Sequence, residues 1–285
     1  MALLTPATVH ALLDAHGLHP KRSLGQNFLA DPNTARRVVS LADLPAAAPV
    51  LEMGPGLGSL TLALLDAGHD VVALELDDRL VDALHEVVAA EAPGDVGRVR
   101  IERGDAVTAD LDALLAPSPS PRACVSNLPY NAAVPVVARL LEEARAVERI
   151  LVMVQREVGE RLAAGPGDAQ YGAVSVKVAY FAEATVVGLV PPTVFVPRPK
   201  VDSALVRLRR RAAPAVTVPS ADDLFALVRA GFAQRRKMLR RSLAPVLGDA
   251  TPAVLDAAGV APTARAEALG LDDWAAVARC AAETA

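Results

Sequence analysis

A side-chain amide, a proline and an aromatic ring stand together near the middle of the chain, at Asn127-Leu128-Pro129-Tyr130. An amide oxygen accepts hydrogen bonds from an exocyclic amine, proline fixes a bend in the backbone, and a tyrosine ring offers a flat stacking face. Together these groups suit a purine base that has been flipped out of its helix. The alternative is a turn at the end of a strand with a packed tyrosine, which is the favoured interpretation of an isolated Asn-x-Pro-x.

A glycine-rich loop follows an apolar run earlier in the chain, at Gly54-Pro-Gly56-Leu-Gly58. Glycines let the backbone turn tightly and let a ligand approach without interference from Cβ atoms. Glu75 closes the next apolar run, 21 residues after Gly54, and a carboxylate there can accept hydrogen bonds from both hydroxyls of a ribose. The pair favours an adenosine-type cofactor, whereas the loop alone could be a tight strand-to-helix turn.

The glycine spacing helps to distinguish a dinucleotide from S-adenosylmethionine as the cofactor. Dinucleotide enzymes usually show G-x-G-x-x-G, with a pyrophosphate at the helix N-terminus. This chain has G-x-G-x-G, and Glu52 stands two residues before the first glycine. That arrangement suits the cationic sulfonium and amino-acid end of S-adenosylmethionine better. Asp105 could accept the adenine amine of the cofactor, although a helix cap or a turn explains Asp105 equally well when it is taken alone.

With such a methyl donor, the Asn127 tetrapeptide has a specific use. An adenine N6 amine is a poor nucleophile because its lone pair is delocalised into the ring. If the Asn127 oxygen and a backbone carbonyl hold its hydrogens, the nitrogen gains sp³ character and its lone pair can point at the methyl group. No strong base is required, since the proton can leave to water afterwards, so catalysis would consist of alignment and hydrogen bonding.

Short apolar runs that alternate with helical patterns would position these side chains. We predict strands at residues 49–54, 70–76, 98–105, 122–127 and 149–155, with helices between them. This rhythm calls for a parallel sheet with helices on both faces, a Rossmann-like α/β fold. The carboxyl ends of the strands would then bring the glycine loop, Glu75 and the Asn127 motif to one edge of the sheet.

The pattern changes after the fifth strand. Residues 173–190 and 191–210 look like strands without long helices between them, which predicts a terminal hairpin on the sheet. Helical patterns follow from Ser220, which forms a plausible capping box with Asp223. We therefore predict an α/β domain over residues 1–212 and a small helical domain over 213–285.

One continuous helix is predicted after Ser220. Its apolar residues fall on one narrow face: Phe225, Val228, Phe232, Leu239 and Leu243. An adjoining arc is cationic: Arg236, Lys237, Arg240 and Arg241. Residues 198–241 hold twelve Lys and Arg against three Asp, a net +9, which leaves −13 on the rest of the chain. This asymmetry indicates a surface for a polyanion, and a merely solvated basic helix is the alternative.

The composition of the whole chain limits the number of domains and argues against membrane proteins, metalloproteins and disulfide-rich proteins. A chain of 285 residues with 52% apolar content suits one large and one small domain. Charges break every long apolar run, and the first residues do not form a signal peptide, so no membrane partner is expected. Two cysteines, Cys124 and Cys280, and five scattered histidines form no metal-ligand pattern. A reducing cytosol, no metal and no disulfide framework are the expectations.

Nine stretches, in order and spanning nearly the whole chain, carry a family resemblance. The chain resembles the ribosomal RNA adenine N6,N6-dimethyltransferases, specifically the small-subunit type whose loss gives kasugamycin resistance. The matching stretches are KRSLGQNFL (21–29), LEMGPGLGSLT (51–61), VVALELD (71–77), GDA (104–106), SNLPYN (126–131), MVQREVGERLAA (153–164), YGAVSV (171–176), FVPRPKVDSALVRL (195–208) and FAQRRKMLRRSL (232–243). The resemblance implies a Rossmann-like class I S-adenosylmethionine-dependent methyltransferase domain with a small all-helical C-terminal domain. It also implies that the N-terminal segment around residues 26–29 is a lid on the first domain.

The resemblance also implies residue roles. S-adenosylmethionine would be held by Asn27, Leu29, Gly54, Glu75, Asp105 and Asn127. The methyl-transfer site would comprise Asn127, Leu128, Pro129, Tyr130 and Phe195, with the rings of Tyr130 and Phe195 on either side of the target adenine. Ribosomal RNA would be bound by Arg235, Arg236, Lys237, Arg240 and Arg241. Arg198 stands where the family commonly has a proline, and it would add a phosphate contact.

The activity implied is dimethylation of two adjacent adenines in the 3′-terminal hairpin of small-subunit (16S) rRNA, on a nearly assembled subunit. A cytoplasmic monomer is expected. The nearest rival is the large-subunit type that confers macrolide resistance, which shares the cofactor loop and an Asn-x-Pro-Tyr motif. A non-catalytic RNA-binding or assembly factor is the rival from another class, and a dehydrogenase is a distant third.

Overall fold

The computed structural model describes residues 2–20, 25–117 and 122–284, which form two compact units. The first unit comprises residues 1–159 and 184–210, and the second comprises residues 160–183 and 211–285. The second unit thus takes in a segment, 160–183, that the sequence boundary near residue 212 assigns to the first domain. Each unit has its own buried apolar cluster.

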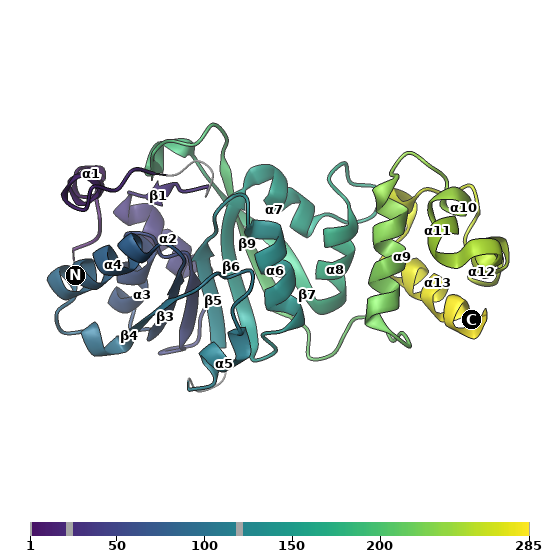
Figure 1. The fold of residues 1–285 in the computed structure, drawn as a ribbon, viewed down its shortest axis with the longest axis horizontal. Helices are drawn as coiled ribbons and strands as arrows, with labels where there is room; N and C mark the ends of the chain where they lie inside the picture. The colour runs from purple at the N-terminus through teal and green to yellow at the C-terminus, as the bar shows by residue number, and fades with distance from the viewer. Residues whose placement is uncertain (1, 21–24, 118–121, 285) are drawn as a thin grey trace. The chain divides into compact units, whose positions relative to one another are not determined.

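A seven-stranded sheet forms the centre of the first unit in the described part of the chain (Figure 1). Its strands, in spatial order, are β4 (Val99–Arg103), β3 (Val71–Glu75), β2 (Val50–Met53), β5 (Arg122–Asn127), β6 (Val147–Gln155), β9 (Ser203–Arg210) and β7 (Ala182–Val190). The first five are mutually parallel, and β9 runs antiparallel to β6. A separate antiparallel pair joins β1 (Phe28–Leu29) to β8 (Phe195–Val196).

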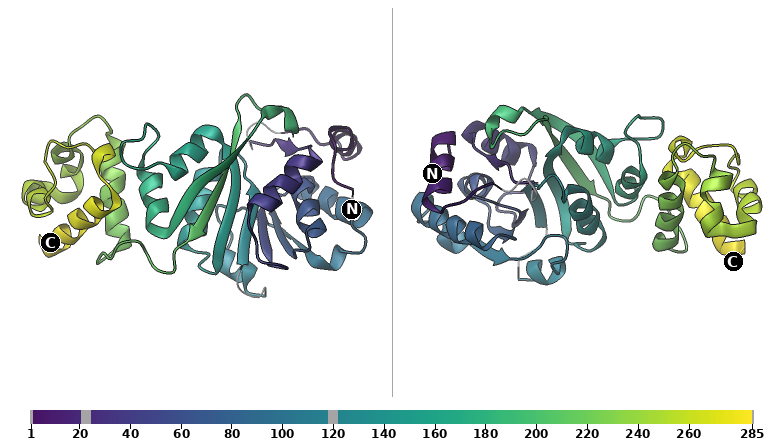
Figure 2. Two further views of the ribbon diagram at one scale, coloured as in Figure 1. Left: turned by 180° about the vertical axis from the view of Figure 1, so that it is seen from behind. Right: turned by 45° about the horizontal axis from the view of Figure 1, so that its top comes forward.

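Helices connect the parallel strands and lie on both faces of the sheet. Figure 1 shows α6 in front of it, and the reverse view of Figure 2 shows α2 in front of the other face. The α-helices of this part are α1 (Pro6–Ala15), α2 (Pro32–Leu41), α3 (Ser59–Asp66), α4 (Asp78–Glu91), α5 (Leu111–Leu115), α6 (Ala133–Glu142) and α7 (Arg156–Ala163). Short 3₁₀ turns are η2 (Val96–Arg98) and η3 (Pro192–Val194).

The five predicted strands and the parallel sheet are confirmed. Every residue of β2 and β3 is buried, which explains why they are continuous apolar runs rather than alternating ones. Spatial order reverses between β2 and β5, because β2 leads through β3 to β4 on one side and β5 leads to β6 on the other. Ligands of such sheets bind where the order reverses, beyond the carboxyl ends of the strands.

Ser126 holds β2 and β5 together at this point. The two strands pair at Val50 with Ala123 and at Leu51 with Cys124. Two residues further on, the Met53 N–H donates to the Ser126 hydroxyl over 2.9 Å. A side-chain hydrogen bond thus replaces the backbone hydrogen bond between the two strands at this position. The Ser126 side chain is fully buried.

Replacing this hydroxyl should therefore destabilise the first unit. In a Ser126→Ala variant the buried Met53 N–H loses its acceptor, and we expect the free energy of unfolding to fall by about 1–3 kcal/mol. Denaturant titration measures the change, with Ser40→Ala on the exposed end of α2 as the control. Equal stability of the two variants would contradict this account.

The described residues of the second unit are mostly helical; they also include the end of α7 and the first two residues of β7. Its elements are α8 (Ala173–Phe181), α9 (Ala221–Ala233), α10 (Leu239–Ser242), α11 (Ala244–Leu247), η4 (Gly248–Ala250), α12 (Thr251–Ala257), η5 (Ala266–Ala268) and α13 (Leu271–Thr284). Trp274 is fully buried at its centre, 6.1 Å from the Phe232 ring. Ser220 is the N-cap of α9, as predicted, and its hydroxyl accepts from the Asp223 N–H.

One predicted strand is a helix. Residues 173–181 form α8, although the Val-x-Val alternation is typical of a strand. Val176 and Tyr180 are buried one helical turn apart, and the Tyr180 ring packs edge-on against Phe225 at 5.3 Å. The Ser175 hydroxyl accepts from the Gly172 N–H and stabilises the helix start. Tertiary packing has overridden the local β preference.

The single long helix predicted after Ser220 is also wrong. α9 ends at Ala233, and α10 begins at Leu239 after a turn. The N–H groups of Leu239 and Arg240 donate to the carbonyls of Ala264 and Pro262 instead of to the preceding helical turn. These tertiary hydrogen bonds satisfy the backbone where the helix would otherwise have continued.

Candidate active site

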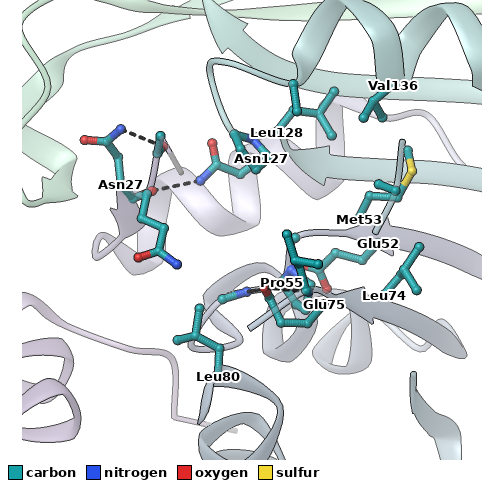
Figure 3. Close-up of a pocket in the computed structure, with 18 of the residues that line it drawn as sticks. Asn27, Glu52, Met53, Pro55, Leu74, Glu75, Leu80, Asn127, Leu128 and Val136 are labelled. Carbon is teal, nitrogen blue, oxygen red and sulfur yellow. Dashed lines mark hydrogen bonds between the residues drawn. The ribbon is translucent and has the colours of Figure 1, made fainter. Parts of the chain in front are cut away.

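A cavity of about 380 Å³ opens at the carboxyl ends of the parallel strands in the first unit (Figure 3). This volume lies within the range of roughly 300–1,000 Å³ that is usual for small-molecule sites. Residues from five segments line it: the Gly25–Leu29 stretch, the loop after β2, the loop after β3, the loop after β4, and the Asn127–Val136 stretch. These segments are distant in sequence, and the strand order brings them to one place.

The glycine loop lies directly against the Asn127 motif. Gly54 has φ +71°, a conformation that favours glycine. A Cβ atom at Gly54 would lie 3.3 Å from Cδ of Pro129, so the two segments could not approach as closely with a larger residue. The Gly54 N–H donates to the Leu74 carbonyl over 2.9 Å, which anchors the loop to β3.

Glu75 lies at the end of β3 with its carboxylate beneath the glycine loop (Figure 3). One oxygen accepts from the Gly56 N–H at 3.1 Å, and the other accepts from the N–H groups of Leu76 and Asp77 at 2.9 and 3.1 Å. Burial raises the pKa of Glu75, and these three hydrogen bonds oppose that shift. Since a carboxylate has about four acceptor positions, capacity remains for a ligand hydroxyl.

Replacing Glu75 tests its part in the cavity. In Glu75→Gln one acceptor oxygen becomes an NH₂ group, which cannot accept from the loop or from a ribose hydroxyl. We expect the Kd of S-adenosylhomocysteine to rise roughly 10–100-fold, because hydrogen bonds to a charged group are lost. Calorimetric titration measures the Kd, and Asp78→Asn, an exposed acid in the first turn of α4, is the control. An unchanged Kd in Glu75→Gln would rule out this role.

Glu52 lies deeper, on β2, and only 1% of it is exposed. Its carboxyl accepts from the Thr61 hydroxyl at 2.6 Å. Burial raises the pKa of Glu52 to about 8, and the Thr61 hydrogen bond opposes the rise. The predicted acid of the cofactor loop is therefore present in the cavity wall, in an environment that favours its neutral form.

Asp105 follows β4 and lines the cavity. One of its carboxylate oxygens accepts from the Val107 N–H at 2.8 Å, and its carbonyl accepts from the N–H groups of Thr108 and Ala109. The turn that was the alternative explanation for Asp105 is thus real. It also places the carboxylate at the cavity wall, where the role of accepting the adenine amine stays a prediction.

The Asn127 amide is held from the N-terminal segment. Its Nδ2 donates to the Asn27 carbonyl over 3.1 Å, and Nδ2 of Asn27 donates to the Gly25 carbonyl at the same distance (Figure 3). Because the nitrogen of Asn127 is engaged by a carbonyl, the amide oxygen is the atom left to accept from a ligand. An amide that binds the amine of a ligand needs its oxygen available as an acceptor, and this geometry provides that.

The two predicted stacking rings lie in different surroundings. The Tyr130 ring is partly buried at the cavity, and its hydroxyl is 2.7 Å from that of Ser203 at the start of β9. Burial raises the pKa of Tyr130, which keeps the phenol neutral. Phe195 pairs with Leu29 across β8 and β1, is only 3% exposed, and is not among the described cavity-lining residues.

Comparison with known proteins identifies the family. The family model described as "Ribosomal RNA adenine dimethylase" matches residues 17–283 of this chain. The chain belongs to the ribosomal RNA adenine dimethylase family. Its relatives include the "Ribosomal RNA small subunit methyltransferase A" of Thermobifida fusca, 50% identical over 97% of this chain and 95% of the relative. The protein of the same name in Streptomyces coelicolor is 48% identical over 97% and 96%.

Solved structures agree with this assignment. The 23S rRNA methyltransferase ErmE is 30% identical, with a TM-score of 0.65 over 89% of this chain and 99% of that one. A dimethyladenosine transferase from Plasmodium falciparum shares the fold, with a TM-score of 0.70 at 23% identity, over 88% and 95%. This adenine dimethylase is therefore a Rossmann-like class I methyltransferase with a helical C-terminal part, and it uses S-adenosylmethionine to methylate adenine in ribosomal RNA.

The cavity of this adenine dimethylase fits that cofactor. The Gly54 loop packs closely against Pro129 in the cavity wall, Glu75 has spare acceptor capacity, and Asp105 presents a carboxylate. Asn27 and Leu29 also line the cavity, as the resemblance implied, whereas residues 21–24 of the same matching stretch lie outside the described residues. Among the described residues, no group of three His, Cys, Asp or Glu could hold a metal ion.

The predicted RNA-binding cations of this family member lie in the second unit and divide into two kinds. Arg236, Lys237, Arg240 and Arg241 are exposed. Arg235 is exposed too, but its guanidinium donates to the Glu267 carboxylate at 3.0 Å and to the Ala169 carbonyl at 2.8 Å. Arg235 therefore holds parts of the second unit together. None of the described helices is long and apolar enough to cross a membrane.

Several residues of the site escaped the sequence analysis. Ser126 and Ser203 lie inside matching stretches but received no role, because the groups they bind, the Met53 N–H and the Tyr130 hydroxyl, are each 73 residues away in sequence. Leu76 lines the cavity although half of it is exposed. Its position directly after Glu75, at the carboxyl end of β3, was the available signal.

Proposed function

We propose that this adenine dimethylase acts on the small subunit, where it converts two adjacent adenines of the 3′-terminal hairpin of 16S rRNA to N6,N6-dimethyladenosine. The names of relatives at 47–50% identity, which cover nearly the whole chain, support the small-subunit target. ErmE, the 23S rRNA enzyme, is 30% identical. The expected setting is a late pre-30S particle in the cytoplasm, with the enzyme as a monomer.

The orientation of the Asn127 amide carries the proposal. Its nitrogen donates to the Asn27 carbonyl, so its oxygen is available to accept a hydrogen of the target N6 amine. Holding that hydrogen withdraws the nitrogen lone pair from the ring and lets it point out of the base plane. Bound S-adenosylmethionine supplies an electrophilic methyl group on a sulfonium. The residues around it contribute alignment rather than a strong base.

The other residues have supporting roles in this proposal. Pro129 packs against Gly54 and keeps the acceptor motif next to the donor loop. Leu128, which is 1% exposed, anchors the tetrapeptide in the core. Tyr130 offers its ring to the target adenine, with its hydroxyl fixed by Ser203. Phe195 would supply the second stacking face only if β8 moved away from β1, because its ring is buried.

The exposed cations of the second unit would bind the rRNA backbone. Arg236, Lys237, Arg240 and Arg241 are exposed, and the 198–241 region carries a net charge of +9 on an otherwise acidic chain. Contacts of this kind position an RNA without reading its sequence. Arg198, in the loop before β9, would add a phosphate contact.

Methyl transfer to unmodified ribosomes tests the proposal. Purified protein would be incubated with labelled S-adenosylmethionine and small subunits that lack the modification, and the rRNA would be digested to nucleosides. We expect N6,N6-dimethyladenosine from two adjacent positions of the small-subunit RNA, and none from large subunits treated in parallel. Label in the large subunit alone would show that the protein is of the 23S type, and no label in either would refute the proposal.

A further inference from the structure

Arg139, on α6, reaches across to the loop that follows β4. Its Nη1 donates to the Ala106 carbonyl over 3.2 Å, and its Nη2 donates to the Ala109 carbonyl over 2.8 Å. Its Nε is 3.0 Å from the Glu143 carboxylate, one helical turn further along α6. The guanidinium is thus held by Glu143 on its own helix while it binds two backbone carbonyls of a distant loop.

The loop that Arg139 binds is the one that carries Asp105. Asp105, Ala106 and Val107 all line the cavity. The loop makes its own turn, in which Val107 donates to the Asp105 carboxylate and Ala109 donates to the Asp105 carbonyl. Arg139 adds two hydrogen bonds from outside. A planar guanidinium with donors in a fixed fork restricts the orientation of such a loop more than a single flexible donor would.

α6 also contributes to the other half of the cavity. It begins at Ala133, three residues after Tyr130, and Pro135 and Val136 in its first turn line the cavity. One rigid helix therefore contacts the cavity near its start and fixes the Asp105 loop near its end. A rigid connection of this kind sets the Asp105 carboxylate relative to the Asn127 motif.

We propose that Arg139 is a positioning residue for cofactor recognition: by holding the Ala106 and Ala109 carbonyls, it orients the Asp105 carboxylate so that the cavity selects adenine over other purines. This inference rests on the proposed role of Asp105 as the acceptor of the adenine amine. A ligand with an oxo group at position 6 of the purine presents a carbonyl oxygen to the carboxylate and is rejected, provided that the carboxylate is held in place.

The test compares two ligands that differ only at that position. Calorimetric titration gives the Kd of S-adenosylhomocysteine and of its deaminated analogue S-inosylhomocysteine, and the ratio of the two measures purine selectivity. We expect the native protein to prefer the adenine ligand roughly 10–100-fold, as a hydrogen bond to a charged group predicts. In Arg139→Met, which keeps the apolar stem, the preference should shrink to about threefold or less, because the carboxylate is no longer held.

Glu143→Gln is the matched control. It removes the ion pair on α6 and leaves both hydrogen bonds from Arg139 to the loop, so its selectivity should equal that of the native protein. The ratio is measured within each variant and does not depend on how much protein is folded. A lower melting temperature in Arg139→Met with unchanged selectivity would show a merely structural role and overturn the inference.

The remaining outcomes separate this inference from the role of Asp105. If the native protein binds both ligands equally, then Asp105 does not read the adenine amine, and the inference fails together with that role. If the native protein discriminates and Arg139→Met discriminates as strongly, only the inference about Arg139 fails. If Glu143→Gln loses selectivity as Arg139→Met does, the ion pair on α6 rather than the loop contact is responsible, which also overturns it.

Discussion

An Asn127→Ala variant should bind S-adenosylhomocysteine with nearly native affinity and lose methyl transfer by roughly 10²–10³-fold in kcat, the usual range for removing one preorganised hydrogen-bonding group. The reason is geometric. The Asn127 nitrogen is held by the Asn27 carbonyl, and in the proposed function its oxygen accepts from the target amine. The substitution leaves intact the glycine loop and Glu75, to which the proposal assigns the methyl donor.

Single-turnover transfer to unmodified small subunits and calorimetry with S-adenosylhomocysteine measure the two effects. Asn127→Asp gives a useful comparison, because its carboxylate can accept from the amine but cannot donate to the Asn27 carbonyl. It should therefore retain more activity than Asn127→Ala and less than the native protein. Native turnover by Asn127→Ala would refute the role of this amide.

A Glu52→Gln variant should be more stable than the native protein at alkaline pH and equally stable in acid. Burial raises the pKa of Glu52 from 4.5 to about 8 in the folded protein. Between these values the folded state keeps a proton that the unfolded chain releases, so the stability of the native protein falls as the pH rises through this window. Glutamine resembles the protonated acid and avoids that loss.

The expected gain is about 2–4 kcal/mol at pH 8 and close to zero near pH 4.5, since each unit of pKa shift corresponds to about 1.4 kcal/mol. Denaturant unfolding of the ligand-free protein at the two pH values measures it. Glu148→Gln, which makes the same change of side chain at an exposed position of β6, is the control. A gain for Glu52→Gln of the same size at both pH values would disprove the titration.

The parallel half of the fold and most of the site were predictable from the sequence because local patterns encode them. Buried parallel strands are continuous apolar runs, and the acid or amide that follows each run lies at the carboxyl edge of the sheet. This reasoning placed Gly54, Glu75, Asp105 and Asn127 around one cavity, as the structure does. The resemblance added Asn27 and Leu29, which no pattern near them distinguishes from an ordinary loop.

The failures of prediction share a physical cause, because each depends on partners distant in sequence. α8 has the alternation of a strand and is a helix, since Val176 and Tyr180 pack into the core of the second unit. The helix after Ser220 stops because residues 262 and 264 accept the next backbone hydrogen bonds. The stacking role of Phe195 stays a prediction, and its burial and its pairing with Leu29 likewise depend on residues distant in sequence.

The reversal of strand order between β2 and β5 assigns the two halves of the cavity to different parts of the sequence. In the proposed function, most residues that face the methyl donor come from the segment that ends with the Asp105 loop, and most that face the acceptor base come from the segment that starts with β5. Selection can therefore alter what is methylated by changing the later stretch while the earlier stretch is inherited unaltered. A family that shares its donor half and diversifies its acceptor half is the expected evolutionary product of this sheet.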